Sequence, residues 1–500
     1  MSRKVLEVII QQVHQAKYFG LIVDSTPDIS HIDQLAIVLR YVDTDGDAVE
    51  RFLTFHAIHN HTSSHLHDVI VEYLKSLNID LKYCRGQSYD NASNMSGKYS
   101  GLQARLKDNH LIEYVPCSAH SLNLVGTNAA ECCSSAVSFF GIVQTLYNFF
   151  SGSTHRWELL KEQMKNETRP ITLKSTSTTR WSANADAVKA LKKNFSAIGN
   201  VLCAISNNPE ENLSTRHDAK SLFGSIKTFE FALMLIIWDA ILQRINKSNI
   251  SLQKVNCEIS TIISLYESLV AFIQKVREEF DMYEVEAAKL AFTKEYTSKR
   301  KRNTPKSKHL DESSSTGVSL SDREKFLYET HNVLCDAIIS ELNKRKKAYS
   351  SLDTRFGFLT SKNMGTYEIQ KAAKNFQEIY TDDIEEFPEE YLQFSNFNLG
   401  NITPSEKLKG LKSLGIEHTF PNVSTALQIM LSIPISNCSS ERSFSVLKRI
   451  KNRLRSSISL NNLSYLSLLA IESDLTEVIN FDDVIKDFVS AKTRKMPFHK

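Results

Sequence analysis

Four short strand-like runs, with one helical stretch between the third and the fourth, constrain the N-terminal part of this chain most strongly. The runs cover residues 18–23, 35–42, 52–58 and 81–89. The first run ends at Asp24 and the fourth at Asp90, while residues 65–77 carry apolar side chains at helical spacing. Because a strand that follows a crossover helix pairs in parallel with its neighbour, the pattern predicts a mixed sheet in the order β-β-β-α-β.

The rest of the chain divides into a continuation of this sheet, a long helical part and a C-terminal part. A second helix and a fifth strand near residues 114–120 extend the order to β-β-β-α-β-α-β, a ribonuclease H-like arrangement, over residues 1–131. Residues 132–431 have an almost wholly helical period, which predicts an all-α insertion with a mobile loop at 298–320. Residues 432–500 are expected to complete the first fold. The predicted fold class is therefore α/β with a large all-α insertion.

Composition narrows the class of protein. A chain of 500 residues with 42% hydrophobic residues can bury two or three cores. Its eight cysteines lack regular spacing, and no uncharged run approaches the roughly 20 apolar residues of a membrane span, so we expect a reducing compartment and no membrane. A net charge of +3 does not identify a nucleic-acid binder, and that argument depends on two local basic runs, residues 298–302 and 448–455. For the first run, solvated charge on a loop is an equally good interpretation.

Three acidic side chains are candidates for a metal site: Asp24 and Asp90 at strand ends, and Glu441 far along the chain. Carboxylates on strand ends and a nearby helix suit Mg²⁺ or Mn²⁺, which prefer oxygen ligands. Two such ions activate an attacking oxygen and stabilise a leaving oxygen during displacement at phosphate. Taken singly, Asp24 and Asp90 are equally good turn or cap residues, and Glu441 suits the first turn of a helix.

Several separate motifs resemble those of the hAT superfamily of cut-and-paste DNA transposases, particularly the branch with zinc finger MYM-type proteins and other transposase-derived host proteins. The motifs are Ile22–Thr26, Gly86–Gly97, Cys117–Asn123, Thr179–Trp181, Ser440–Ser445 and Lys451–Arg455. They span nearly the whole chain, and the last two resemble the superfamily's C-terminal dimerisation region. The resemblance implies a ribonuclease H-like fold that a helical insertion splits before the glutamate, and it favours the metal site over the three separate caps.

The resemblance also implies roles for individual residues. Asp24, Asp90 and Glu441 would be the catalytic, metal-binding triad, and His120 would sit near the scissile phosphate. Trp181 would stack on a displaced DNA base, a contact worth about 1–3 kcal/mol. A tryptophan at the start of a helix is more often a core anchor, and outside the family context that interpretation is the better one.

Further residues are implied in DNA contact and self-association. Arg180 would meet phosphate, for which its forked guanidinium is suited. The other expected DNA contacts are Lys448, Arg449, Lys451 and Arg453, and the expected dimer contacts are Phe444, Leu447, Leu460, Leu463 and Leu466. The partners would then be DNA and further copies of the same chain, in a homodimer or higher oligomer in the nucleus.

The N-terminal stretch leaves two hypotheses open. Complete transposases of this type carry a zinc-binding module that recognises transposon ends, and no Cys/His cluster of that spacing precedes Asp24. The first hypothesis is a DNA strand-transfer enzyme that uses Mg²⁺ or Mn²⁺. The second is a non-catalytic, dimeric DNA- or chromatin-associated protein derived from a transposase. An unrelated nuclease of the same fold is a weaker third.

Overall fold

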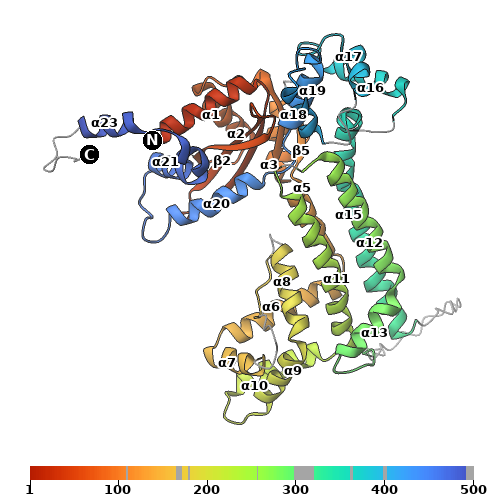
Figure 1. Cartoon of the computed structure of the whole chain (residues 1–500). Helices are drawn as coiled ribbons and strands as arrows, with labels where there is room; N and C mark the ends of the chain where they lie inside the picture. Colours follow the sequence, from red (N-terminus) through yellow and green to blue (C-terminus); the bar gives the residue numbers. More distant parts are fainter. Residues whose placement is uncertain are drawn as a thin grey trace, which may run out of the picture. The chain divides into compact units, whose positions relative to one another are not determined.

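The chain folds into two compact units (Figure 1). The computed structural model describes residues 1–107, 111–164, 172–177, 181–255, 257–297, 320–360, 364–397 and 403–490. A sheet unit comprises residues 1–121, 252–263 and 347–500, and a helical unit comprises residues 122–251 and 264–346. All but the last residue of the loop expected at 298–320 lies outside the described residues.

A five-stranded mixed sheet forms the centre of the sheet unit, as the apolar runs predict. Its strands are β1 (Phe19–Pro27), β2 (Asp33–Val42), β3 (Ala48–Ile58), β4 (Cys84–Tyr89) and β5 (Glu113–Pro116), in the spatial order β3-β2-β1-β4-β5. The first three strands pair antiparallel, and β4 and β5 continue the sheet in parallel. Nearly every residue of β2 is buried, as expected for a sheet covered on both faces.

Helices from both ends of the chain cover this sheet. The first helix, α1 (Ser2–Ala16), buries Val5, Ile9 and Val13, which lie on one face because they are four residues apart. The other elements of this unit's N-terminal part are α2 (Ser63–Ser76), the 3₁₀ turn Leu81–Tyr83, α3 (Ser93–Ser96) and α4 (Leu102–Leu106). From the C-terminal part come α20 (Cys438–Ile450), α21 (Leu460–Ile471), α22 (Ser473–Val478) and α23 (Asp482–Ser490). Helix α20 packs on β1, β2 and β3, and α21 packs on β3.

The boundary of the helical part differs from the one that periodicity predicts. Residues 347–431 belong to the sheet unit, although their helical period placed them in the insertion. Their elements are the 3₁₀ turn Gly357–Leu359, α16 (Thr366–Ile379), α17 (Phe387–Asn396), α18 (Pro404–Ser413) and α19 (Pro421–Ser432). Helix α19 packs against β1, β2 and β4. A helical period shows that one face is buried, but not against which core.

The helical unit is built around a cluster of aromatic rings. Its elements, some of which continue into the sheet unit, are α5 (Ser118–Ala130), α6 (Ser134–Ser151), α7 (Thr154–Met164), α8 (Trp181–Lys193), α9 (Phe195–Asn207), α10 (Leu213–Ile226), α11 (Phe229–Leu252), α12 (Ile259–Glu278), α13 (Phe280–Leu290), α14 (Asp322–Phe326), the π-helical turn Leu327–His331 and α15 (Asn332–Phe356). Trp181 and Trp238 stack with ring centroids 6.0 Å apart, and Phe140 meets Trp238 edge-on at 4.8 Å. These large apolar side chains give the unit a core of its own.

One helix among the described residues, or two if the bent pair α5 and α6 counts as one span, is long and apolar enough to cross a membrane by length and composition alone. The single helix is α12. It buries Tyr266, Leu269 and Ile273 on one face, and Glu267 beside them pairs with Lys346 at 3.2 Å. That amphipathic pattern is typical of a helix packed on a protein core.

Candidate functional site

Asp24 and Asp90 occupy neighbouring positions because their strands run in parallel. β1 pairs with β4 in a register in which Ile22 faces Ser88. Two residues further along, Asp24 lies inside β1, three residues before its end and not at the end that the sequence predicts, and Asp90 directly follows β4, so both come to the same edge of the sheet. Both side chains are half-buried. The sheet itself therefore brings the first two acids together.

A tight backbone crossing brings the C-terminal segment onto these two strands. Gly20 of β1 faces Gly86 of β4, and Ile433 and Pro434 cross directly over them. A Cβ atom at Gly20 would stand 2.5 Å from the Pro434 ring, and one at Gly86 would stand 2.8 Å from it. Because glycine has no Cβ, these two positions admit the close approach. The crossing leads straight into α20.

The start of α20 lies beside Asp24. Asn437, the residue before the helix, donates from Nδ2 to Asp24 Oδ2 at 3.4 Å. Glu441 belongs to the first turn, where its backbone N–H donates to Asn437 O at 3.2 Å. The backbone of Ser118, at the start of α5, donates to Ile435 O at 3.1 Å. The ends of β1 and β4 and the starts of α5 and α20 thus meet in one place.

The electrostatics of Asp24 place Glu441 and Asp90 each within range of its carboxylate. Burial raises the pKa of Asp24 well above its ordinary value, and the negative charges of Glu441 and Asp90 raise it further. A cation among these carboxylates would relieve that repulsion. Among the residues that the structure describes, however, no three His, Cys, Asp or Glu side chains stand close enough to share a metal ion. The donor chemistry fits a divalent cation, but the side chains do not converge on one point.

A buried ion pair supports α20, and the sequence pattern did not indicate it. Arg40 Nη1 donates to Glu50 Oε1 at 2.9 Å, and both side chains are only 4% exposed. Ser439 Oγ donates to the other oxygen of Glu50, and Arg40 Nε donates to Leu431 O at 2.8 Å. The pair therefore ties both ends of the crossing segment to the sheet and positions the first turn that carries Glu441. In the sequence, Arg40 and Glu50 are visible as charged residues within two strands. A charged residue in a strand does not reveal which residue it pairs with.

His120 lies on the turn next to the loop that follows Asp90. Its backbone N–H, in the first turn of α5, donates to Cys117 Sγ at 3.4 Å. The next residue, Ser121, accepts at Oγ from Asn91 Nδ2 at 3.2 Å. Because Asn91 follows Asp90 directly, this hydrogen bond joins the turn of His120 to the acidic edge of the sheet. The turn that carries the half-buried His120 therefore lies beside the loop that follows Asp90.

A second histidine lies near the same edge, outside all the motifs described above. His61 Nε2 is 3.3 Å from Asp33 Oδ2, and the backbone oxygen of His61 accepts from Asn94 Nδ2 at 3.1 Å. Burial raises the pKa of Asp33, and the nearby His61 opposes that shift. Asp33 in turn contributes a small part of the raised pKa of Asp24. In the sequence, the feature that could have pointed to His61 is the histidine-rich stretch after β3.

Trp181 is a core side chain of the helical unit, which corrects the prediction that it stacks on a DNA base. It is 5% exposed, and its Nε1 donates to Thr127 Oγ1 at 2.9 Å. The ring packs against Trp238 and lies so close to Gly126 that a Cβ there would stand 2.8 Å from an indole carbon. Close packing leaves no space for a base, so Trp181 is the core anchor of the alternative interpretation. Arg180 lies outside the described residues.

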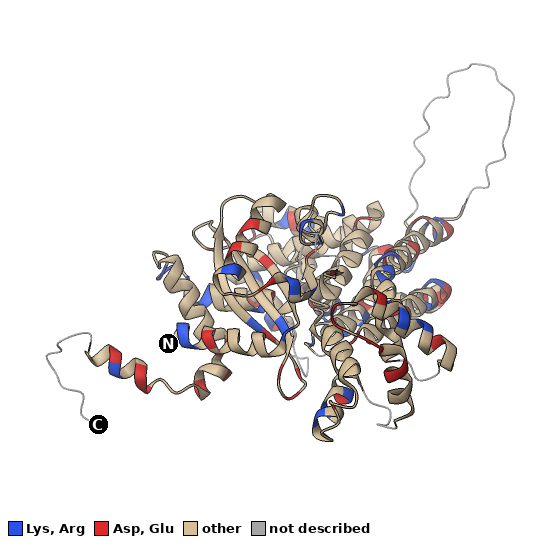
Figure 2. Cartoon of the chain, turned by 90° about the horizontal axis from the view of Figure 1, so that it is seen from above, with Lys and Arg blue, Asp and Glu red and all other residues tan. Residues whose placement is uncertain are grey.

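The basic run at residues 448–455, which begins in the last turn of α20, is only partly exposed. Lys448, Arg449 and Arg453 are exposed, and basic and acidic residues are mixed along much of the ribbon (Figure 2). Lys451 is different: its Nζ lies 2.6 Å from Asp28 Oδ2, and the two side chains are 3% and 1% exposed. The prediction that Lys451 contacts DNA is wrong, because the helix ends at Ile450 and the next side chain turns inward.

The predicted dimer contacts separate into core and surface. Leu447 and Leu463 are buried in the core of the sheet unit, and Phe444 stacks on a phenylalanine of β3 with centroids 6.1 Å apart. The prediction for Leu447 and Leu463 is wrong, since their apolar faces are already covered by the sheet. Leu460 and Leu466 are 42% and 38% exposed, so they remain available to a partner.

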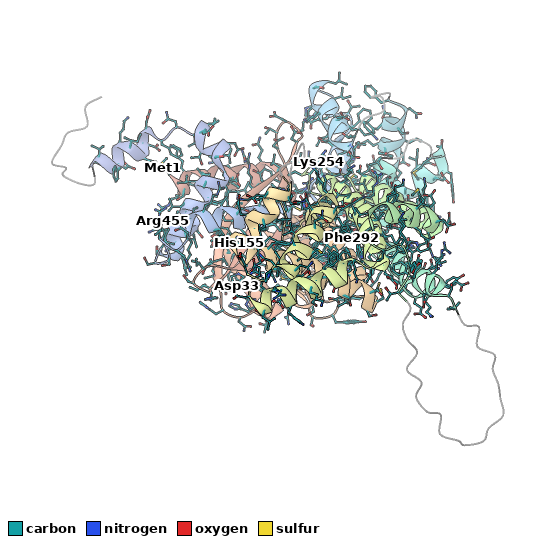
Figure 3. The ribbon with its side chains drawn as sticks, turned by 90° about the horizontal axis from the view of Figure 1, so that it is seen from below. Met1, Asp33, His155, Lys254, Phe292 and Arg455 are labelled. Atoms are coloured by element: carbon teal, nitrogen blue, oxygen red, sulfur yellow. The ribbon has the colours of Figure 1, made fainter. Side chains whose placement is uncertain are left out.

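A groove of about 420 Å³ opens along the exposed side of α21 and the segment before it. Its lining residues are Leu454, Arg455, Ser457, Ile458, Asn462, Tyr465 and Leu466. The Arg455 side chain is exposed among the C-terminal elements (Figure 3). Nearby in the sequence, α23 exposes Ile485 and Phe488 by 55% and 56%. The C-terminal part therefore exposes apolar side chains on both α21 and α23.

Comparison with known families matches both ends of the chain. Residues 1–101 match the family described as the ZMYM1/FAM200 RNase-like domain, DUF4371. Residues 388–475 match the hAT family C-terminal dimerisation region. The first segment contains Asp24 and Asp90, and the second contains Glu441. The two matched segments both lie in the sheet unit, on either side of the helical unit in sequence.

Two curated relatives are similar to this chain over 98% of its length, each with 22% identity. Both are named 52 kDa repressor of the inhibitor of the protein kinase, one from Homo sapiens and one from Mus musculus. The chain spans 66% of the length of each relative, which is less than two thirds of it.

Proposed function

The chain is a hAT-transposase-like protein, and from that premise we propose that its sheet unit is a ribonuclease H-like nuclease domain split by the helical unit. In this proposal Asp24, Asp90 and Glu441 hold the divalent cations of DNA cleavage and strand transfer. The observation that carries it is geometric: the pairing of β1 with β4 brings Asp24 and Asp90 to one edge of the sheet, and the start of α20, which carries Glu441, hydrogen-bonds to Asp24 through Asn437. DNA is the proposed partner and the nucleus the proposed location, because the C-terminal match is to a transposase family.

The residues around the acids would prepare the site for phosphate chemistry. Bound Mg²⁺ or Mn²⁺ would activate an attacking oxygen and stabilise a leaving oxygen. Asp24 and Asp90 offer oxygen ligands from rigid neighbouring strands, and Glu441 offers them from a helix turn. Asn437 orients Asp24 by donating to Oδ2. His120 would donate a hydrogen bond to a phosphate oxygen, and the three carboxylates would rotate towards one another when they share the ions.

Asp24→Asn is expected to abolish Mn²⁺-dependent nicking of supercoiled DNA while raising the melting temperature of the ion-free protein. The amide is a poor ligand for a hard cation, but it removes a buried charge that two neighbouring carboxylates oppose. Nicking assays and melting curves of the full-length chain, recorded in EDTA and in Mn²⁺, check both effects. Wild type should gain stability from Mn²⁺ because the ion binds the folded state, and the variant should gain much less.

The matched control for this experiment is Asp45→Asn. Asp45 is exposed in the turn between β2 and β3. This turn follows the C-terminal end of β2, whereas Asp24 pairs with Ala36 near the start of that strand. This variant should nick DNA and respond to Mn²⁺ as wild type does. A wild-type chain whose melting temperature ignores Mn²⁺ would reject the metal site, whereas a normal Mn²⁺ shift without nicking would reject catalysis alone.

Self-association without catalysis is a second candidate function, and the exposed side of α21 favours it. Leu460, Tyr465 and Leu466 are 42%, 51% and 38% exposed, while the other side of the helix is buried on the sheet. The match to a dimerisation region agrees with association through this surface. We therefore place the contact between copies at the groove beside α21.

Tyr465→Glu combined with Leu466→Glu is expected to weaken self-association by at least about 30-fold, because central interface residues contribute about 2 kcal/mol or more each. Light scattering of the full-length chain over a range of concentrations measures the effect. Leu213→Glu, at a leucine on α10 that is 80% exposed, is the matched control and should change nothing. A wild-type chain that stays monomeric at micromolar concentration would contradict the proposal, and unchanged association in the double variant would exclude this groove.

A further inference from the structure

A separate groove of about 470 Å³ lies between α8, α11 and α13 in the helical unit. Its lining residues are Lys189, Lys192, Lys193, Ile236, Glu286, Lys289 and Leu290. None of them belongs to the carboxylate site, the basic run at residues 448–455 or the groove beside α21. The volume falls in the range of about 300–1,000 Å³ that is typical of ligand sites. This groove has no role in the function proposed above.

Lysine dominates the rim of the groove. Lys189, Lys192 and Lys193 share one side of α8, because residues three and four apart lie on the same face of a helix. Lys192 and Lys193 lie in the last turn of α8, where positive charge stabilises a helix, whereas Lys189 lies one turn earlier. Lys192 Nζ donates to Asp239 Oδ2 at 2.8 Å, which holds this side chain in position. Lys289 adds a further positive charge from α13.

The floor of the groove is apolar, in contrast to its rim. Ile236 of α11 is 4% exposed, and the half-buried Leu290 ends α13. Around this floor, the four lysines outnumber the two carboxylates, which belong to Glu286 and Asp239. The groove therefore combines an attraction for negative charge at its edges with an apolar surface at its base.

We propose that this groove binds an acidic amphipathic helix of a partner protein. Apolar side chains on one face of such a helix would rest on Ile236 and Leu290, and the carboxylates that flank this face would reach the lysines. A DNA backbone is a poorer match, because phosphates would use the rim and leave the floor uncovered. Arginine, whose fork grips phosphate at two points, is absent from the residues that line the groove.

Fluorescence anisotropy of a labelled synthetic peptide tests the proposal on the full-length chain. The peptide has about five helical turns, with leucines along one face and glutamates beside them. Lys189→Glu combined with Lys289→Glu is expected to weaken its binding at least about tenfold, because two attractive charges become repulsive. Added salt should also weaken binding to wild type, since the rim is open to solvent.

Three controls separate the groove from general charge effects. Lys220→Glu combined with Lys247→Glu makes the same change in net charge at exposed positions of α10 and α11, and should bind as wild type does. A peptide of the same composition in scrambled order keeps the charge but loses the apolar face, so it should bind more weakly. Leu290→Ser should weaken binding of the ordered peptide and leave that of the scrambled one unchanged.

Two results would overturn the proposal. One is equal binding of the ordered and scrambled peptides, and the other is full affinity in the variant with two reversed rim charges. A duplex DNA probe that binds more tightly than the peptide, and loses affinity in that variant but not in the control, would assign the groove to nucleic acid. Nicking activity is not measured, so failure here leaves the carboxylate site unaffected.

Discussion

The Gly86→Val variant is expected to lower the free energy of unfolding of the full-length chain by at least about 3 kcal/mol, the upper part of the range for an overpacked core. A Cβ at this position would lie 2.8 Å from the Pro434 ring and 3.0 Å from the Cα of Ile433. The contacts involve a ring and backbone, which cannot turn aside as a flexible side chain can. Urea unfolding followed by circular dichroism measures the loss.

Gly141→Val is the matched control for this substitution. Gly141 is exposed on α6, where a Cβ meets nothing within 4 Å. Because glycine is the poorer helix former, valine there should leave stability unchanged or raise it by a few tenths of a kcal/mol. Equal unfolding midpoints for the two variants would show that the crossing at Gly86 is not a close contact in solution.

Gly86→Val also tests how Glu441 comes close to Asp24 and Asp90. If Ile433 and Pro434 are pushed off the sheet, α20 loses its fixed starting point and Glu441 moves with it. The Mn²⁺-induced rise in melting temperature should then fall along with stability. A destabilised variant that keeps the full Mn²⁺ response would show that Glu441 is not needed for the ion.

Lys451→Met is expected to destabilise the sheet unit by about 3–5 kcal/mol, because it leaves the buried carboxylate of Asp28 without its cation. Lys451 Nζ and Asp28 Oδ2 are 2.6 Å apart, and both side chains are almost fully buried. Gln34 Nε2 and the backbone of Ser30 also donate to Asp28, at 2.9 Å and 2.7 Å, but neither carries a positive charge. Urea unfolding of the full-length chain measures the difference.

The effect of this variant should depend on pH. Burial by itself raises the pKa of Asp28, but hydrogen bonds from Lys451 and from nearby groups outweigh it, so the pKa lies below its ordinary value. A carboxyl with a lowered folded-state pKa contributes stability above about pH 4, and loses it as the pH falls through that lower pKa. The gap between wild type and Lys451→Met should be full at neutral pH and should narrow below about pH 4.

Lys448→Met, in the last turn of α20 just before Lys451, is the control. Lys448 is exposed, so the change should alter stability by no more than about 0.5 kcal/mol. In a DNA-binding assay Lys448→Met should have the larger effect of the two variants. It should reduce both the affinity for DNA and the salt dependence of that affinity, since a phosphate contact would be lost. Equal stability of the two variants would contradict a structural role for Lys451.

Local pattern was enough to locate the strands and the two acids at or near their C-terminal ends. The run 35–42 lies within two residues of β2, because burial on both faces of a sheet requires such residues. The run 18–23 starts within one residue of β1 but ends four residues before the strand does, since Asp24 and the three residues after it still pair with β2. The parallel pairing of β1 with β4 follows from the crossover helix between them. Once β1 and β4 pair in parallel, their register alone brings Asp24 close to Asp90, without a contribution from any other element.

Long-range contacts decided the roles that local pattern assigned wrongly. Lys451 belongs to a basic run, yet a carboxylate more than four hundred positions earlier draws it into the core. Leu463 shares a broad apolar helix with Leu466, but β3 covers one and leaves the other exposed. Trp181 is enclosed by rings from other helices. In each case the partner that settles burial is distant in sequence and leaves no local signal.

The sequence alone determined the five-stranded sheet, its crossover helix and the positions of Asp24 and Asp90, because periodicity and strand pairing depend on neighbouring residues. Only the tertiary structure decided how Glu441 approaches them, through the crossing of Pro434 over Gly20 and Gly86. It also decided which cations and leucines face solvent. The physical reason is that burial and pairing of a side chain depend on atoms that the fold, not the local chain, places around it.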